Sequence, residues 1–255
     1  MREHVETLDG MPVRWLEEPW AGGEPLLYVH GVPNAADMWA PFLAHAGGIA
    51  VDLPGFGGSG KPADWPYGME AFAGFLERFL DWRSVERVRV VAHDWGAAGL
   101  LLGERVTRAV AIATVPMLPG HGWHRFARLW RTPLAGELAM GFTGRFALRR
   151  ATGLPREEVG AILRHFDHGT QRAILKLYRG ADAEALARSG ERMRALGGPV
   201  LVVWGEADPF LDPAWAQRLA AVLPSDRAEV VPGAGHWPWL DDRSVVARVA
   251  EFANG

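Results

Sequence analysis

Short apolar runs alternate with amphipathic stretches along the first 116 residues of the chain. An alternating pattern predicts a strand at 11–16, and continuous apolar runs predict buried strands at 26–29, 48–53, 88–91 and 109–115. Between them, the stretch 69–82 predicts an amphipathic helix and 99–103 a short one. Strands that are apolar throughout and alternate with helices predict an α/β fold, with a parallel sheet covered on both faces.

The pattern changes near residue 116 and returns near residue 198. The segment between them has no strand-like run, and its helical periodicity is clearest at 157–166 and 171–179. The chain then predicts, in order, a strand, a helix, a strand and a helix at 199–204, 214–223, 228–231 and 243–252. We therefore predict an α/β core, 1–116 and 198–255, and a small helical cap segment, 117–197, over the carboxyl edge of the sheet.

Composition and charge exclude several classes of partner. A net charge of −3 over 255 residues lacks the basic surface that phosphate recognition needs, so no nucleic-acid partner is predicted. The absence of cysteine excludes disulfides, thiolate catalysis and cysteine-ligated metals. The polar start, 1–6, argues against a signal peptide, and no apolar run approaches the ~18 residues of a membrane span. We expect a cytoplasmic protein, a monomer or homodimer, with no membrane partner.

Asp94 lies at the apex of a sharp turn from strand to helix. The strand 88–91 runs into Ala92-His93-Asp94-Trp95-Gly96-Ala97, whose small residues suit a tight elbow. The usual elbow is Gly-x-Ser-x-Gly, but here the nucleophile position holds Asp, and no serine of this chain lies in such a turn. We interpret Asp94 as a nucleophile; the alternative is a plain helix N-cap.

Two further polar residues follow predicted strands. Asp208 comes after the strand at 199–204, and His236 comes after the strand at 228–231. Loops at the carboxyl ends of parallel strands converge on one crevice, so we expect Asp94, Asp208 and His236 to meet. The backbone N–H groups of Val32 and Trp95 are then placed to form an oxyanion hole. The alternatives are that Asp208 is a turn residue and His236 a core histidine.

These motifs together resemble the α/β-hydrolases of the aspartate-nucleophile branch, which includes epoxide hydrolases and haloalkane dehalogenases. The resemblance rests on His30-Gly31-Val32-Pro33, Asp52-Leu53-Pro54-Gly55-Phe56-Gly57-Gly58-Ser59, His93-Asp94-Trp95-Gly96, Asp208 and His236. It implies a mostly parallel eight-stranded sheet with a helical cap. It also implies that Asp94 attacks an sp³ carbon to form an ester, which water activated by His236 then hydrolyses, with Asp208 orienting the histidine.

The glycine-rich loop 55–61 admits a second interpretation. Gly55-x-Gly57-x-x-Gly60 fits a dinucleotide fingerprint, and the loop fits most of a Walker A motif. Pro62, however, occupies the position that should hold Mg²⁺ through Ser or Thr, and no helix is predicted there. We interpret the loop as structural and predict no cofactor and no metal.

The resemblance leaves the substrate open between epoxide and haloalkane. Tyr178 resembles the cap tyrosine that protonates an opening epoxide, although it is also consistent with a plain amphipathic helix; we predict an epoxide hydrolase acting on a small apolar substrate. The first alternative is a dehalogenase that holds halide through Trp95 and a cap tryptophan; the second is a binding protein without turnover. A second cap donor is left open among His121, Trp123, His124 and Trp130. The residues predicted to line the substrate pocket are His30, Trp123, Phe126, Trp130 and Trp237.

Overall fold

Eight strands form one sheet in the computed structural model, which describes residues 1–225 and 227–255. The strand order is β1-β2-β4-β3-β5-β6-β7-β8. The pairs β1–β2 and β2–β4 are antiparallel, and every other pair is parallel. The predicted mostly parallel eight-stranded sheet is confirmed. Its strands are β1 Arg2–Leu8, β2 Met11–Glu18, β3 Leu26–Val29, β4 Gly48–Val51, β5 Val88–His93, β6 Val106–Ile112, β7 Val200–Gly205 and β8 Arg227–Val231.

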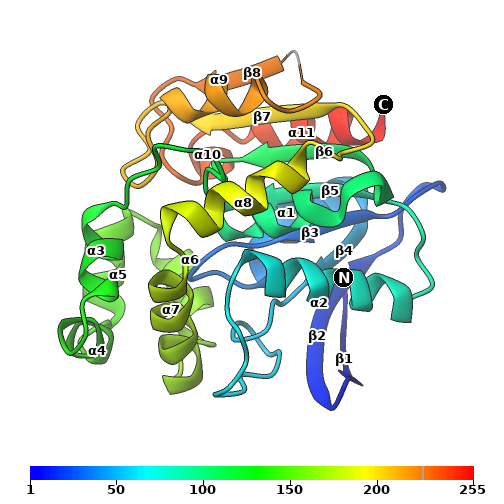
Figure 1. The fold of residues 1–255 in the computed structure, drawn as a ribbon. Helices are drawn as coiled ribbons and strands as arrows, with labels where there is room; N and C mark the ends of the chain where they lie inside the picture. Colours follow the sequence, from blue (N-terminus) through cyan, green and yellow to red (C-terminus); the bar gives the residue numbers. More distant parts are fainter. Residues whose placement is uncertain (226) are drawn as a thin grey trace.

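Two layers of helices cover the two faces of the sheet (Figure 1). Side chains of the central strands alternate between them: Val29 and Val90 pack into one apolar cluster, and Tyr28 and Val91 into the other. The first cluster also takes apolar side chains from α2 Met69–Trp82, η2 Asp94–Arg105, α8 Ala183–Met193 and α9 Ala214–Ala220. The second takes them from η1 Ala36–Trp39, α1 Ala40–Ala46, α10 Pro238–Asp241 and α11 Ser244–Asn254. Because the central strands are buried on both faces, their sequences are apolar throughout.

Six helices separate β6 from β7, although these two strands are neighbours in the sheet. Five of them gather at one end of the sheet (Figure 1), whereas α8 packs against η2 and α2. The five are α3 Arg125–Arg131, α4 Ala135–Gly141, α5 Arg145–Thr152, α6 Arg156–Leu163 and α7 His168–Gly180. The division into a core and a cap segment with the predicted boundaries stays a prediction. In the part of the chain that the structure describes, no helix has both the length and the apolar character that a bilayer crossing requires.

The glycine-rich loop folds back on a buried carboxylate at the end of β4. Asp52 accepts hydrogen bonds from the Ala36 and Gly58 amides at 2.6 and 2.8 Å, and from the Arg14 guanidinium at 2.9 Å. Gly57 has φ of +56°, and a Cβ on it would lie 2.0 Å from the Asp52 carboxylate. The backbone at 60–62 is not helical. A nucleotide-binding loop presents free backbone amides to phosphate. In this loop the Gly58 amide instead donates to the Asp52 carboxylate, which supports a structural role.

Candidate active site

The elbow between β5 and η2 holds Asp94 in a strained conformation. Its φ is +53°, a region that residues other than glycine seldom adopt. The turn also needs close backbone approach, because a Cβ on Gly96 would lie 2.0 Å from the Val29 carbonyl oxygen. Likewise a Cβ on Gly31 would lie 2.4 Å from the Asp94 side chain. These two glycines let the elbow and the loop after β3 come together.

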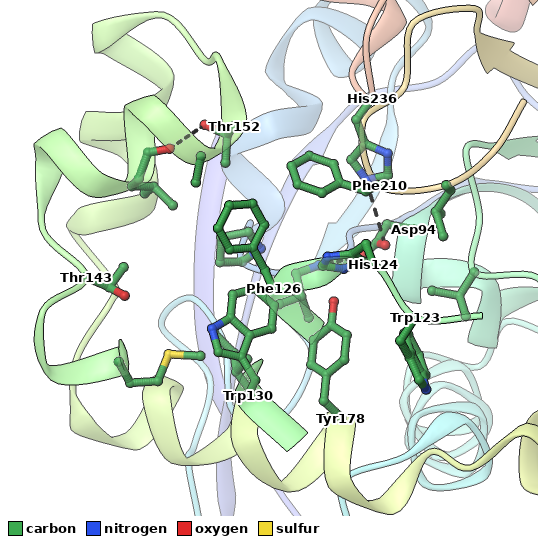
Figure 2. A pocket seen from close by; sticks show the side chains of 18 of the residues that line it. Asp94, Trp123, His124, Phe126, Trp130, Thr143, Thr152, Tyr178, Phe210 and His236 are labelled. Carbon is green, nitrogen blue, oxygen red and sulfur yellow. Dashed lines mark hydrogen bonds and ion pairs between the residues drawn. The ribbon is translucent and has the colours of Figure 1, made fainter. Parts of the chain in front are cut away.

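The three residues predicted to form a catalytic triad lie side by side. His236 Nε2 is 3.7 Å from Asp94 Oδ2 (Figure 2), and His236 Nδ1 is 2.7 Å from Asp208 Oδ2. The other Asp208 oxygen accepts hydrogen bonds from the amides of Phe210 and Leu211 at 2.8 and 3.0 Å. The carboxylate of Asp208 is thus fixed by its own loop, and it orients the imidazole so that Nε2 faces Asp94.

Two backbone amides contact the Asp94 carboxylate, and one of them holds Oδ1. The Val32 N–H donates to Asp94 Oδ1 at 2.9 Å, and the Trp95 N–H also hydrogen-bonds the carboxylate. If water attacks the carboxyl carbon of an Asp94 ester, this oxygen takes the developing negative charge, so the donors already stand where an oxyanion forms. The predicted amides of Val32 and Trp95 therefore come together at Asp94.

Burial and the charges of neighbouring groups shift the pKa values of Asp94 and His236. Burial raises the pKa of Asp94, an effect that His236 and the two amides partly offset. Burial by itself lowers the pKa of His236, but the charge and hydrogen bond of Asp208, together with the charge of Asp94, raise it overall.

A narrow apolar cavity of about 60 Å³ opens above Asp94 and His236, several times the volume that one water needs. Most of its walls are aromatic or aliphatic. Among the residues that line it are Val32, Asp94, Trp123, His124, Phe126, Trp130, Tyr178, Phe210, His236 and Trp237. Such a lining suits a small apolar molecule, with a few polar groups aimed at the reacting atoms.

The family follows from this fold together with the sequence. A family model described as "Alpha/beta hydrolase family" matches residues 26–249. The chain belongs to the alpha/beta hydrolase family. It is 28% identical to epoxide hydrolase A of Mycobacterium tuberculosis, over 99% of this chain and 97% of that protein. The chain is therefore a hydrolase, as predicted.

Two haloalkane dehalogenases are also similar to this alpha/beta hydrolase. One, from Mesorhizobium japonicum, is 32% identical over 47% of this chain and 44% of that protein. A solved structure of another, from Bradyrhizobium elkani, has a TM-score of 0.83 and 24% identity, covering 100% of this chain and 98% of that one. At that identity the structural likeness concerns the fold.

Tyr178 of this hydrolase points from α7 into the cavity. Figure 2 shows its hydroxyl directed toward Asp94 and His124. Burial, and then the charge of Asp94, hold the pKa of Tyr178 well above 10, so the hydroxyl stays protonated. The nearby Trp95 indole opposes this shift, although its N–H does not reach hydrogen-bond geometry.

Among the candidates for a second donor, His124 has a ring nitrogen that is held by a backbone amide. Its Nδ1 accepts a hydrogen bond from the Ala127 amide at 3.3 Å, which leaves the proton of the neutral ring on Nε2. Burial, and then the charge of His236, lowers the pKa of His124 to about 4. The imidazole is therefore neutral near pH 7, beside Tyr178.

The structure brings most of the predicted pocket residues together and excludes one. Trp123, Phe126, Trp130 and Trp237 line the cavity with Asp94. His30 does not, and the prediction that it lines the pocket is wrong. Its Nε2 accepts from the Leu53 amide at 3.0 Å, so its Nδ1 carries the proton and donates to the Gly31 carbonyl at 2.9 Å. His30 braces the loop that carries Val32.

Sequence reasoning missed Phe210. Its ring centroid lies 5.2 Å from that of His236, and it also lines the cavity. The signal was its position two residues after Asp208, in the loop whose amides fix that carboxylate. In residues 1–225 and 227–255, no three His, Cys, Asp or Glu side chains converge on a point where they could hold a metal ion.

Proposed function

We propose that this hydrolase opens small apolar epoxides to diols. Asp94 Oδ2, the oxygen nearer His236 Nε2, attacks one ring carbon, and the bond from that carbon to the epoxide oxygen breaks. Tyr178 donates its proton to that oxygen, leaving a hydroxyalkyl ester and a phenolate. The neutral His124 donates a second hydrogen bond to the same oxygen through Nε2.

Hydrolysis of the ester completes the cycle. His236 removes a proton from water, which attacks the Asp94 carboxyl carbon, and Oδ1 takes the charge in the Val32 and Trp95 amides. The intermediate expels the diol alkoxide, which takes the proton from His236. The Asp94 carboxylic acid then returns its proton to the Tyr178 phenolate, so that one epoxide and one water give one diol.

The observation that carries the proposal is the protonated Tyr178 hydroxyl directed at the nucleophile. A dehalogenase instead needs N–H donors that face a leaving halide. Trp95, whose indole N–H lies beside the nucleophile, is fully buried, and among the residues that the structure describes it does not line the cavity. Val32 has no side-chain donor. These facts support epoxide opening over halide displacement.

Trapping the ester tests the proposal directly. His236→Gln removes the base that activates water, so the ester should accumulate when the variant meets styrene oxide. Intact-protein mass spectrometry should show one adduct equal to the whole epoxide, mapped by peptide digestion to Asp94. Asp94→Ala is the matched control and should remain unmodified.

Other outcomes contradict the proposal in distinct ways. An adduct equal to the alkyl group of a bromoalkane, with none from the epoxide, would indicate a dehalogenase. An adduct on another residue would refute Asp94 as nucleophile. Tight binding of a range of epoxides and haloalkanes with neither adduct nor turnover would indicate a ligand-binding protein.

A further inference from the structure

Exposed apolar side chains gather on three helices of the cap segment. Leu134, Leu138, Phe142 and Phe146 are 64–83% exposed, and Leu129 is 40% exposed. We call these five residues the cap patch. Elsewhere in the described chain the large exposed apolar residues are Met1, Val5, Trp82 and Val230, and these lie outside the cap segment. Clustered exposed apolar side chains indicate an interaction surface, unlike single ones.

The cap patch follows from the way α3, α4 and α5 are built. Leu138 lies on α4, and Leu134 and Phe142 flank that helix as its N-cap and C-cap residues, while Met140 is buried on the side of α4 that faces the protein. Leu129 and Phe146 line a shallow hollow between α3 and α5. Figure 1 shows these helices projecting at the left of the molecule, away from the sheet.

Positive charge surrounds the patch. Between 117 and 156 the chain carries seven arginines and a single acidic residue, Glu137, although its overall net charge is −3. Glu137 is already paired with Arg179, at 2.7 Å. The five exposed arginines on α3 and α5 form no ion pair with any residue that the structure describes; they are Arg125, Arg128, Arg145, Arg149 and Arg150.

We propose that the cap patch and these arginines bind the surface of an anionic lipid membrane. Leucine and phenylalanine side chains enter the boundary between headgroups and acyl chains, while flanking arginines attract anionic headgroups. A second copy of the chain is a poorer partner, because two arginine-rich faces repel each other. The expectation of no membrane partner rested on the lack of a spanning segment, which does not bear on surface binding.

The patch also lies close to the catalytic cavity. Phe126 and Ala151 line both the cavity and the hollow that contains Leu129 and Phe146. One layer of side chains therefore separates the proposed lipid-facing surface from the site. The proposal itself depends on exposure and charge, and it holds whichever reaction Asp94 performs.

Vesicle flotation with purified full-length protein tests the proposal. The protein should float with vesicles that contain phosphatidylglycerol, and not with vesicles of pure phosphatidylcholine. Each arginine near the surface is worth about fivefold in partitioning, so R149Q/R150Q should bind about 25-fold more weakly. F142S/F146S should abolish flotation, and added salt should weaken it.

Matched variants separate this surface from general stickiness. Val5→Ser removes an exposed apolar side chain from β1, and Arg243→Gln removes an exposed arginine at the start of α11. Both should bind anionic vesicles like the wild type. Equal binding to neutral and anionic vesicles, no binding to either, or a dimer in light scattering that F142S/F146S dissociates would each overturn the proposal.

Discussion

The two carboxylate oxygens of Asp94 differ in environment, and that difference assigns their proposed roles. Oδ1 accepts the Val32 amide at 2.9 Å, whereas Oδ2 lies 3.7 Å from His236 Nε2. We assign the attack to Oδ2 and the developing negative charge to Oδ1, which the Val32 amide already holds. A gap of 3.7 Å is too long for a direct hydrogen bond, and it lets the imidazole serve water instead of the carboxylate.

Removing the Tyr178 hydroxyl tests whether it is a proton donor. Tyr178→Phe keeps the ring that packs against Trp95 and Trp123 but removes the proton, so ring opening should slow by about 10²- to 10⁴-fold. Rapid-mixing kinetics of ester formation should show the loss in kcat with little change in KM. His124→Phe should slow ester formation less than Tyr178→Phe does, because His124 is proposed to donate a hydrogen bond and to keep its proton.

Trp130→Phe serves as the control for these variants, since Trp130 lines the cavity without a proposed chemical role. It should change KM more than the rate of ester formation. A Tyr178→Phe enzyme that forms the ester at the wild-type rate would reduce Tyr178 to a packing residue and remove the main support for epoxide opening.

At the scale of elements, the elbow shows how backbone packing creates the site. η2 begins directly at the end of β5, and its first turn passes against β3 at Gly96. Any side chain at this position pushes η2 away from Val29. The amide of Trp95 and the carboxylate of Asp94 would move with it, so a residue with no chemistry of its own controls the nucleophile's position.

Gly96→Ala should therefore destabilise the protein and impair catalysis. Its Cβ would lie 2.0 Å from the Val29 carbonyl oxygen, and relieving that clash is expected to cost about 1–3 kcal/mol or more, as overpacking does. Gly74→Ala is the matched control: it lies inside α2, with the nearest atom 3.5 Å from the new Cβ. It should stabilise the protein by about 0.5–1 kcal/mol. Urea unfolding measures both, and equal effects would contradict this explanation.

The elements that could be predicted are those governed by the parallel sheet. Asp94, Asp208 and His236 each follow a buried strand, so sheet topology alone brings them together. β1 was missed because its sequence, REHVETL, is mostly polar and its strand lies exposed at the sheet edge. The strand predicted at 109–115 runs over Val106–Ile112, since Thr107 and Arg108 fit the less buried start of the strand.

The cap segment could not be predicted to the same depth. Only the helices at 157–166 and 171–179 had clear periodicity, and they correspond to α6 and α7. The three helices α3, α4 and α5 are short and carry exposed Leu and Phe, which obscures a one-sided apolar pattern. Without a rule like that of the sheet, the sequence could nominate His124 among four donors but could not choose it.

At the scale of the whole molecule, the sheet's carboxyl end concentrates histidines that are buried in neutral form. Burial lowers the pKa of His30, His93, His121 and His124 below 6.5, and for His121 and His124 to about 4. His236 is the opposite case, with a raised pKa. When the chain unfolds, all five return to the ordinary pKa of about 6.5.

Stability should consequently fall as the pH drops from 7 toward 4.5. Below pH 6.5 these four histidines bind protons in the unfolded chain but stay neutral in the folded protein. Each of them therefore lowers the free energy of unfolding by up to about 1.4 kcal/mol per pH unit. His236 acts in the opposite direction: its stabilising contribution is fully present below pH 6.5 and is lost as the pH rises through its raised pKa in the folded protein, so it opposes the other four only above pH 6.5. Urea unfolding at pH 7, 6 and 5 should thus show a decreasing free energy of unfolding.

His121→Phe should flatten that dependence. The ring lies edge-on to Trp123 and Trp215, and neither ring nitrogen has a hydrogen-bond partner in the described residues, so phenylalanine fits without losing a polar contact. Its slope between pH 6 and 5 should be smaller than that of the wild type by up to about 1.4 kcal/mol per pH unit. His45→Gln, which replaces an exposed histidine of α1, is the matched control. A slope that His121→Phe does not alter would show that other groups, chiefly the carboxylates, govern acid unfolding.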